Sequence, residues 1–425
     1  MDRPGASDLL DKGSRALERA EWEAARAAFE SVLEAGPSAE ARDGLGLALW
    51  FLGRIPEGIA AREQAFEELV RAGRGDEAAR VAVWVSHQHL IAGRRSAARG
   101  WLARSERELD GTSAGVGHGW VAVERARHSD DVHEQIAHAR RAMELGRAGG
   151  QRDLEVFALS LLGRATVSAG DPEAGMQLLE EAMAAAAAGS VRNVHTLAEA
   201  YCNLILAATS AGEWERATEW CELVDEFART HTAAPLFASC RTVHADVLLA
   251  TGRWPEAEDA LQTALATHAR YIPEMDAPTV ATLAELRVRQ GRLGEAERLL
   301  AGREEKPVSL RALALLRIAE DRPRMAVALL ERDLRGTEGD TIRATQLLAP
   351  LVDALLACGK TEEARAAADR LAVLAEESRI RLVAARADLA AARIALATGS
   401  GADAAESARR ALAAFSTLLM PLDAG

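Results

Sequence analysis

A two-helix signal recurs along this chain, and the copy around residue 250 shows its parts clearly. Cys240, Val243, Val247 and Ala250 step by 3, 4 and 3 positions, so they share one face of a helix. Gly252 follows, and glycine ends helices because it enters a left-handed conformation without a Cβ penalty. The first half of the signal is therefore an amphipathic helix with a glycine stop.

The second half of the signal is another amphipathic helix. Trp254 and Pro255 begin it, since proline is tolerated in the first turn of a helix. Its apolar stripe consists of Ala257, Ala260, Leu261, Ala264 and Leu265. Neither helix can bury its stripe alone, so each hairpin needs a neighbouring hairpin.

The turn position of this hairpin has equivalents along the whole chain. The intervals between them run from 30 to 42 residues, apart from one interval of 77 residues. That double interval predicts a further hairpin with its turn near residues 129–131, which gives about eleven helical pairs. The equivalent positions are Ala20, Gly53, Gly93, Gly170, Gly212, Gly252, Gly291, Asp321, Gly359 and Gly399.

A small residue lies five positions after every one of these turns. A small side chain at a fixed place predicts that two helices cross closely there. The ten residues are Ala25, Gly58, Ala98, Gly175, Ala217, Ala257, Ala296, Ala326, Ala364 and Ala404. We therefore predict an all-α stack of antiparallel hairpins in one domain, residues 1–425, with a hinge at residues 110–119.

Composition narrows the class of protein further. The chain has 425 residues, a formal net charge of −13 and a pI near 5.4, which argues against a nucleic-acid surface. The N-terminus lacks the apolar stretch of a signal peptide. Four cysteines in so long a chain are not a disulfide framework, so we expect reduced thiols in a cytoplasmic protein.

The first hairpin resembles the tetratricopeptide repeat family. It carries that family's small and large residues at a spacing of 34: Gly13, Ala20, Ala25, Phe29, Val32 and Pro37. The second hairpin keeps Leu45-Gly46, Gly53 and Ala65, and the fifth keeps Leu162-Gly163, Gly170 and Ala182. The resemblance implies a right-handed α-solenoid, although most intervals here are nearer 40 than 34 residues.

Most of the chain also resembles the tetratricopeptide sensor region of actinobacterial LuxR-type transcription regulators. The matching segments are residues 187–192, Tyr201-Cys202, Trp220-Cys221, Cys240-Arg241 and residues 251–254. The resemblance implies a module that senses a signal or drives oligomerisation, with a small-molecule effector or a protein as partner. DNA would then be bound only by a helix-turn-helix that follows Gly425. The alternative is a free-standing adaptor that holds protein or peptide partners.

The short segments that match catalytic motifs lack the neighbouring residues or secondary structure that those motifs require. Residues 111–115 match G-x-S-x-G, but a charged helix precedes them where a nucleophile elbow needs a strand. Gly359-Lys360-Thr361 ends like a phosphate loop, but the earlier glycine is Ala354. His133 and His138 are not spaced for one helical face. The sequence therefore predicts a protein that is not an enzyme, with no metal site and no cofactor.

Cys202, Cys221 and Cys240 stand 19 residues apart, whereas zinc sites bring at least one close pair. We interpret them as buried small hydrophobes, with a redox or metal role as the alternative.

Polar residues recur six positions before the turns, where the first helices of a solenoid line its concave wall. Basic or titratable groups come early and acidic groups later, which suits a peptide or a zwitterionic small molecule; ordinary solvated charges are the alternative. With residues one and two turns back on the same face, the candidates are Arg80, His87, Phe157, Arg164, Glu199, Cys202, Asp246 and Glu285.

A second candidate group combines aromatic residues with one guanidinium. Tyr201 and Arg241 both lie eleven positions before their turns, beside Cys202 and Cys240. Stacking and a carboxylate fork could anchor a ligand there; packing between repeats is the alternative. Trp22, Trp214 and Trp254, each two positions after a turn, are predicted to wedge between hairpins.

Overall fold

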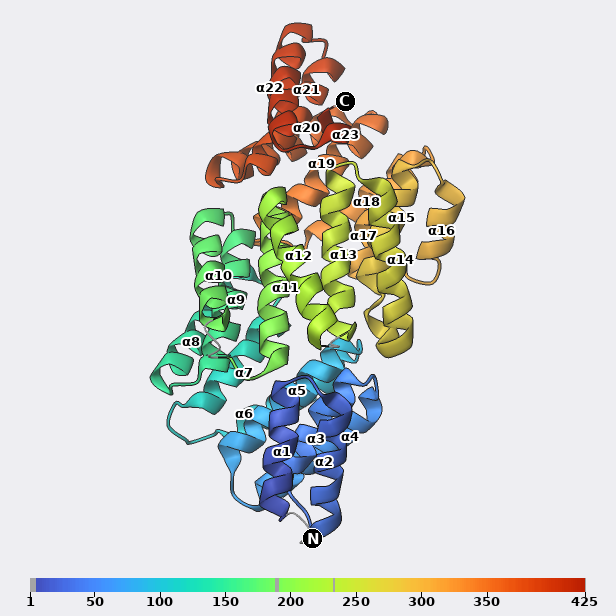
Figure 1. Cartoon of the computed structure of the whole chain (residues 1–425). Coiled ribbons are helices and arrows are strands. Elements are labelled where there is room, and N and C mark those ends of the chain that lie inside the picture. Colours follow the sequence, from blue (N-terminus) through green and yellow to red (C-terminus); the bar gives the residue numbers. More distant parts are fainter. Residues whose placement is uncertain (1–4, 188–190, 232–233, 425) are drawn as a thin grey trace.

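The structure is a computed structural model that describes residues 5–187, 191–231 and 234–424. Regular secondary structure in these ranges is entirely helical, with 23 α-helices, one short 3₁₀ turn and no strand. The helices pair into eleven antiparallel hairpins, followed by one short helix (Figure 1). This arrangement confirms the all-α solenoid expected from the repeat.

The first six hairpins are α1 (Ala6–Glu18) with α2 (Trp22–Ala35), α3 (Ala39–Phe51) with α4 (Ile55–Arg71), α5 (Gly75–Ile91) with α6 (Arg95–Glu108), α7 (Val116–His128) with α8 (Val132–Ala148), α9 (Arg152–Ser168) with α10 (Pro172–Ala187), and α11 (Val194–Ala211) with α12 (Trp214–His231).

The remaining hairpins are α13 (Ala234–Ala250) with α14 (Trp254–Tyr271), α15 (Ala277–Arg289) with α16 (Leu293–Leu300), α17 (Pro307–Ala319) with α18 (Pro323–Leu334), α19 (Thr341–Ala357) with α20 (Thr361–Glu377), and α21 (Arg381–Ala397) with α22 (Gly401–Thr417). The 3₁₀ turn η1 (Pro273–Met275) follows α14, and α23 (Pro421–Ala424) follows α22.

The turns lie where the sequence placed them. All ten predicted turn positions have left-handed backbone, with φ between 55° at Ala20 and 101° at Gly170. The predicted eleventh turn also exists, because residues 129–131 separate α7 from α8. Two turn residues, Ala20 and Asp321, adopt this conformation without being glycine, and they carry the strain that a Cβ brings there.

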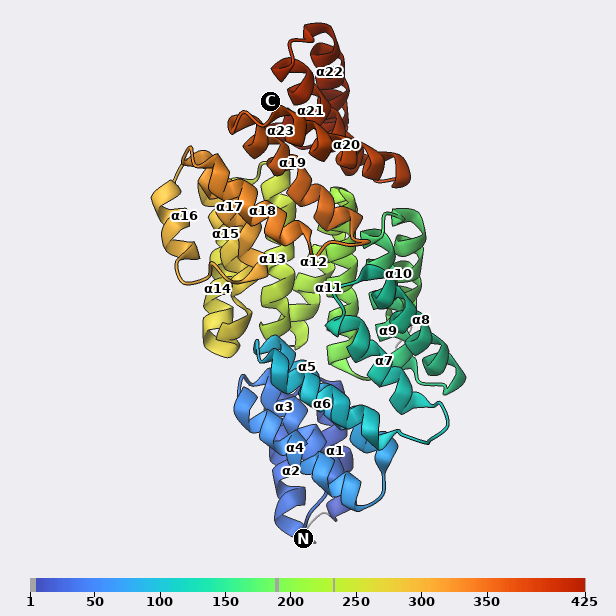
Figure 2. The ribbon, with the colours of Figure 1, turned by 180° about the vertical axis from the view of Figure 1, so that it is seen from behind.

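The hairpins form two layers. Each odd-numbered helix packs on the next odd-numbered helix over most of the chain, as α9 does on α11 and α11 on α13. Each even-numbered helix packs on the odd-numbered helices on either side of it in sequence. We call the layer of odd-numbered helices the first-helix layer; Figure 2 shows the same stack from behind.

The two helices of a hairpin cross where the small residues were expected. Nine of the ten small residues are buried, and Ala404 is half-buried. In α9 and α10 the contact is glycine on glycine: a Cβ built on Gly175 would lie 2.6 Å from the carbonyl oxygen of Gly163. Gly46 and Gly58 face each other in the same way in α3 and α4. Small size at this position is therefore a packing requirement.

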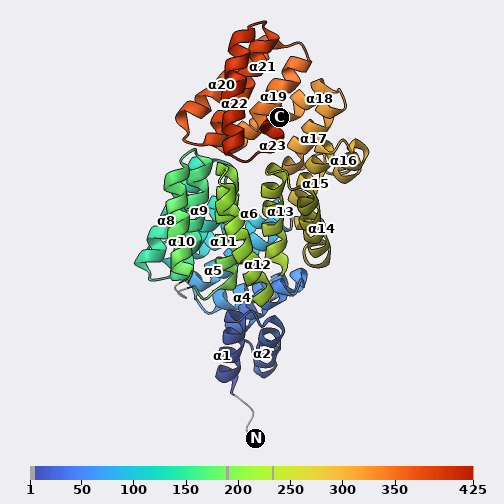
Figure 3. The same ribbon diagram turned by 45° about the horizontal axis from the view of Figure 1, so that its top comes forward.

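The stack turns back on itself, so hairpins far apart in sequence touch. The α3–α4 turn at Gly53 lies against Tyr271, and the α11–α12 turn at Gly212 lies against Leu382 and Leu418. Figure 1 shows α1–α6 at one end of the molecule and α19–α23 at the other, and the tilted view in Figure 3 shows α1 and α2 at the end opposite α20–α22. Two of the apolar clusters cross these junctions, and each joins early to late hairpins.

Tryptophans pack in these junctions, as the sequence predicted. Trp22 is 4% exposed and stacks on Phe51 with ring centroids 4.0 Å apart. Trp214 is buried and Trp254 is half-buried. The loop at the predicted hinge spans residues 109–115, because α7 begins at Val116. Among the described residues, no helix is long and apolar enough to cross a lipid bilayer.

Candidate binding surface on the first-helix layer

The predicted wall residues lie on the first-helix layer, on helices that follow one another in the stack. His87 on α5 and Glu285 on α15 are buried. Arg164 on α9 and Asp246 on α13 are half-buried. Because these side chains are partly or wholly withdrawn from water, the charges among them need partners. The partners come from neighbouring hairpins.

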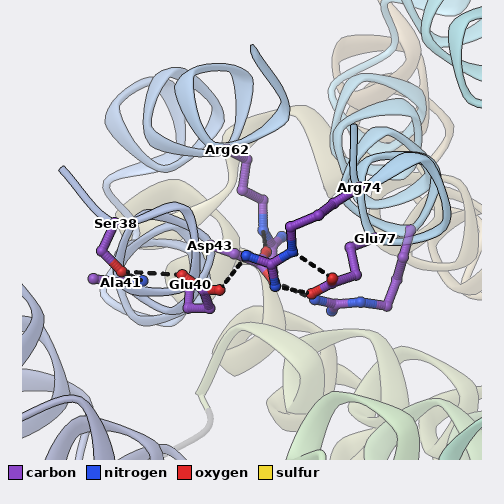
Figure 4. Close-up of polar contacts among 8 residues, drawn as sticks. Ser38, Glu40, Ala41, Asp43, Arg62, Arg74 and Glu77 are labelled. Carbon is purple, nitrogen blue, oxygen red and sulfur yellow. Dashed lines mark hydrogen bonds and ion pairs between the residues drawn. The ribbon is translucent and has the colours of Figure 1, made fainter. Parts of the chain in front are cut away.

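Asp43 on α3 holds the first group of charges. Its carboxylate accepts hydrogen bonds from Arg62 at 3.1 Å and from the candidate residue Arg80 at 2.9 Å (Figure 4). Burial alone would raise the pKa of Asp43, but Arg80 and Arg62 outweigh it and hold the pKa below its ordinary value. Arg80 is therefore committed to a structural ion pair between hairpins.

Figure 4 shows a second ion network beside Asp43. Arg74 pairs with Glu40 and Glu77, and Ser38 caps α3 by accepting a hydrogen bond from the Ala41 amide. These groups are more exposed than Asp43, and exposed ion pairs contribute little free energy. They fix the entry to α3 and α5 and thereby position the residues of the wall.

His87, His195 and Glu199 form the most enclosed polar cluster on this surface. His87 is 5% exposed and His195 is 2% exposed. Their Nε2 atoms lie 3.7 Å and 3.5 Å from Oε1 of Glu199. Burial lowers the pKa of His87 far below its ordinary value, and it also lowers the pKa of His195. Both rings are therefore neutral at pH 7.

Arg127 on α7 balances the charge of Glu199. Its Nη2 atom lies 3.5 Å from Glu199 Oε1, and its Nη1 atom lies 3.4 Å from Glu124 Oε2. Burial would raise the pKa of Glu199, but Arg127 and His195 outweigh it and hold the pKa well below its ordinary range. The candidate residue Phe157 is fully buried, and its ring centroid lies 4.3 Å from the Cζ atom of the Arg127 guanidinium above it. Phe157 is therefore a platform under a charge.

Asp246 and Glu285 form a pair of acids farther along the layer. Asp246 accepts a hydrogen bond of 3.0 Å from Thr282, and Glu285 pairs with Arg311 at 3.0 Å. Burial, reinforced by the nearby charge of Glu285, raises the pKa of Asp246 to about 7. Asp246 is therefore a carboxyl group that titrates near neutral pH.

Three guanidinium groups of the layer have no polar partner. Arg164 on α9, Arg289 on α15 and Arg386 on α21 are half-buried, and none makes a hydrogen bond or ion pair within the described residues. Arg164 feels the charges of Asp340 and Glu199, and Arg386 those of Asp423 and Glu285, at a distance. Burial lowers the pKa of both, that of Arg386 to about 10, so both remain cationic at pH 7.

The second predicted group packs between hairpins. Tyr201 and Trp220 have ring centroids 6.0 Å apart and border the apolar cluster that joins α2–α4 to α11–α13. Arg241 is half-buried on α13. Residues 188–190, which belong to one of the segments shared with LuxR-type regulators, lie outside what the structure describes.

The cysteine prediction was wrong for one pair. Cys202 on α11 and Cys240 on α13 form a disulfide, with Cα atoms 5.7 Å apart. Spacing of 38 residues in sequence hid the pair, because packing of α11 on α13 brings the two Cα atoms together. Cys221 is buried, as expected, and Cys358 is half-buried, and both lie outside the disulfide. Cys202 is thereby a covalent link in the first-helix layer.

A cleft of about 690 Å³ lies at the junction between two coils of the stack. Met176, Trp214 and Leu418 contribute to its apolar lining, and Glu173 and Arg379 pair across its rim at 3.3 Å. No local sequence pattern predicts this cleft, because it forms only when α10 and α12 meet the α20–α21 loop.

Glu199 was predicted as a wall residue, but the partners that complete the wall were not. His195 lies four residues before Glu199 on α11, which is the one signal that could have marked the two as a unit. Arg62, Arg127 and Arg386 follow from the stacking of hairpins and have no local signature.

A two-layer stack of helical hairpins is an α-solenoid. Residues 10–68 match the family model described as tetratricopeptide repeat. The fold is similar to a Rap protein solved in complex with competence and sporulation factor, with a TM-score of 0.52 and 13% identity. That match covers 97% of this chain and 98% of the other.

Two further solved structures are similar at lower scores. Yeast Tom70 has a TM-score of 0.42 at 13% identity, over 99% of this chain and 94% of Tom70. The Cut9–Hcn1 hetero-tetramer of the APC/C has a TM-score of 0.39 at 13% identity, over 100% and 97%. A comparison with curated protein sequences finds no match.

Proposed function

We propose that the first-helix layer binds a peptide or protein segment by pairing its arginines with carboxylates of that segment. We also propose that the chain is not an enzyme. One observation carries the binding proposal: Arg164 and Arg386 are half-buried cations without a hydrogen bond or ion pair among the described residues. Withdrawing a guanidinium from water costs free energy unless a partner compensates. A carboxylate matches the guanidinium fork in two parallel hydrogen bonds.

The other wall charges favour a segment over a single small anion. Glu199, Asp246 and Glu285 lie on the same layer as the two arginines, so acidic residues on α11–α15 stand between a cation on α9 and a cation on α21. A segment with both acidic and basic side chains can match such a pattern. The Rap protein of similar fold was solved with a named factor bound, which supports the proposal by analogy of fold.

The test is a selection from a random peptide library on the purified chain, followed by titration of synthetic peptides. Arg164→Ala and Arg386→Ala should each weaken binding by about 1–3 kcal/mol, the value of a charge-assisted hydrogen bond. Arg99→Ala, exposed on α6, is the matched control and should bind like the wild type. Equal affinity of all three variants would remove the first-helix layer as the binding surface. Arg241→Ala, on α13, tests the second predicted group in the same assay.

The molecular context belongs to the same proposal. We propose that the module serves a LuxR-type transcription regulator, as a sensor of a signal or as an oligomerising part. The support is a set of short segments on α11–α14 that resemble those of LuxR-type regulators, such as Tyr201-Cys202 and Trp220-Cys221. The coding sequence beyond codon 425 tests this directly. A basic helix-turn-helix there supports the regulator, whereas a stop codon supports a free-standing adaptor. Native mass spectrometry tests self-association and a retained small-molecule effector.

A cytoplasmic location is part of this context, and the Cys202–Cys240 disulfide is the observation against it. The cytosol keeps most thiols reduced. Titration of thiols in protein isolated under non-reducing conditions should find two, from Cys221 and Cys358, where the disulfide is closed. Four reactive thiols after denaturation would mean that the pair is open in the cell, in agreement with the cytoplasm.

A further inference from the structure

The His87, His195 and Glu199 cluster has a bonding deficit that the protein itself does not fill. All four ring nitrogens of the two histidines are buried without a hydrogen-bond partner in the described structure. A buried polar atom left without a partner costs about 1–3 kcal/mol, so native proteins seldom retain several in one place. Something outside the described atoms must compensate for these nitrogens.

The donor atoms are spaced as ligands of one ion. One oxygen of Glu199 and one nitrogen from each ring lie within 4.8 Å of one another. The two nitrogen–oxygen distances are 3.5 Å and 3.7 Å. Zinc bonds of about 2.0–2.2 Å at tetrahedral angles place neighbouring donor atoms about 3.3–3.5 Å apart. The two nitrogen–oxygen distances are therefore within a few tenths of an ångström of this spacing, and the two ring nitrogens, which lie within 4.8 Å of each other, must move closer for all three donors to share one centre.

We propose that His87, His195 and Glu199 bind a divalent transition metal ion of the zinc class on the first-helix layer. Two imidazoles and a carboxylate are the ligand set that such ions prefer, and three protein ligands leave a fourth position open. The Glu199 side chain keeps 21% of its surface accessible, and this gives the ion a path to water.

Arg127 competes with the ion for Glu199. Its Nη2 atom lies 3.5 Å from the same Oε1 atom and has no hydrogen-bond partner of its own, while Nη1 faces Glu124. Metal binding needs the guanidinium to withdraw towards Glu124 and the Phe157 ring. The geometry therefore predicts opposite effects for the ligands and for Arg127, a contrast that a purely structural cluster would not produce.

The experiment is equilibrium dialysis of the metal-free full chain against Zn²⁺, with bound metal counted by mass spectrometry. The wild type should bind one equivalent, which Cys358→Ser should retain. His87→Gln, His195→Gln and Glu199→Gln should each weaken binding by about 100-fold or more. His133→Gln, an exposed histidine on α8, is the matched control and should bind like the wild type. Arg127→Met should bind about tenfold more tightly or better, because a competing positive charge is gone.

Co²⁺ and thermal melting supply independent readouts. Co²⁺ should give the visible bands of a four- or five-coordinate site in the wild type and lose them in Glu199→Gln. Zn²⁺ should raise the Tm of the wild type and leave that of Glu199→Gln unchanged. Circular dichroism of the metal-free variants shows whether they fold, and Glu199→Gln, the least buried change, carries the test if a histidine variant does not. Metal bound equally by wild type and ligand variants, or lost only in Cys358→Ser, would overturn the proposal.

Discussion

Charged side chains on the first-helix layer are destabilised by burial, and neighbouring groups of opposite charge stabilise their ionised forms. Asp43 keeps a low pKa only through Arg80 and Arg62, and Glu199 only through Arg127 and His195. Asp246 lacks such a cation in direct contact, because Arg311 pairs with Glu285 instead. The consequence is a carboxyl group with a pKa of about 7, whose charge costs the folded state free energy.

Asp246→Asn should stabilise the protein clearly at pH 8 and much less at pH 5. The native state keeps a proton that the unfolded chain releases above its pKa of 3.8, so stability falls as pH rises from about 4 to about 7. Asparagine mimics the protonated acid and can still accept the Thr282 hydrogen bond. A shift of about 3 pKa units corresponds to about 4 kcal/mol, at 1.36 kcal/mol per unit. Because water partly screens this half-buried side chain, we take half of that value and expect a gain of about 2 kcal/mol at pH 8.

Urea unfolding at both pH values measures this difference. The matched control is Asp369→Asn, an exposed acid on α20, which should change stability little at either pH. A gain for Asp246→Asn that is equally large at pH 5 would show that the charge is not its source.

Asp321→Gly should raise stability, because the turn between α17 and α18 needs left-handed backbone. Asp321 has φ of 59° and is exposed, so little side-chain packing is lost. Relief of left-handed strain is worth about 1–2 kcal/mol, and the greater freedom of glycine in the unfolded chain offsets about 0.5–1 kcal/mol of it. Unfolding should rank the variants Gly, then Asp, then Ala. An alanine variant as stable as the glycine variant would contradict the strain at this turn.

At the scale of elements, the sequence specifies whatever depends on local chemistry. Turns need left-handed backbone and crossing helices need small side chains, so both leave a residue type at a fixed position, as at Gly252 and Ala257. The contacts between wall residues on different helices have no such signature in the local sequence. His87 and Glu199 meet because α5 and α11 are brought together by superhelical stacking, and Cys202 and Cys240 because α11 packs on α13. Local patterns could therefore predict half of each pairing at most.

Gly175→Ala should destabilise the α9–α10 hairpin by about 1–3 kcal/mol, the usual cost of overpacking. The new Cβ would lie 2.6 Å from the Gly163 carbonyl oxygen and 2.5 Å from a Val167 methyl group. Backbone on both sides leaves no flexible atom to move aside.

Gly100→Ala on α6 is the matched control, since nothing lies within 4 Å of a Cβ there. It should stabilise the protein by about 0.5–1 kcal/mol, the usual gain for alanine over glycine inside a helix. Thermal unfolding of both variants measures the contrast, and a stabilised Gly175→Ala variant would refute the close crossing.

For the whole molecule, contacts between distant hairpins change how stability is shared. In a solenoid with contacts only between neighbours, stability is nearly a sum of local terms, and damage stays local. Here one apolar cluster unites α9–α12 with α19, α21 and α22, and Leu418 lies beside the Gly212 turn, about 200 residues away in sequence. The two regions should therefore open together.

Leu418→Asp tests this coupling. Leu418 is 8% exposed, so the change loses the burial of a leucine and places a charge in an apolar junction, at a cost of about 3 kcal/mol or more. Hydrogen exchange should accelerate in α10–α12 as well as in α20–α22, because both sides of the junction lose their cover. Leu412→Asp on α22, where the leucine is 47% exposed, should leave exchange in α10–α12 unchanged. Acceleration confined to α19–α23 in the Leu418 variant would mean that the coils do not support each other, and that the protein behaves as a linear array.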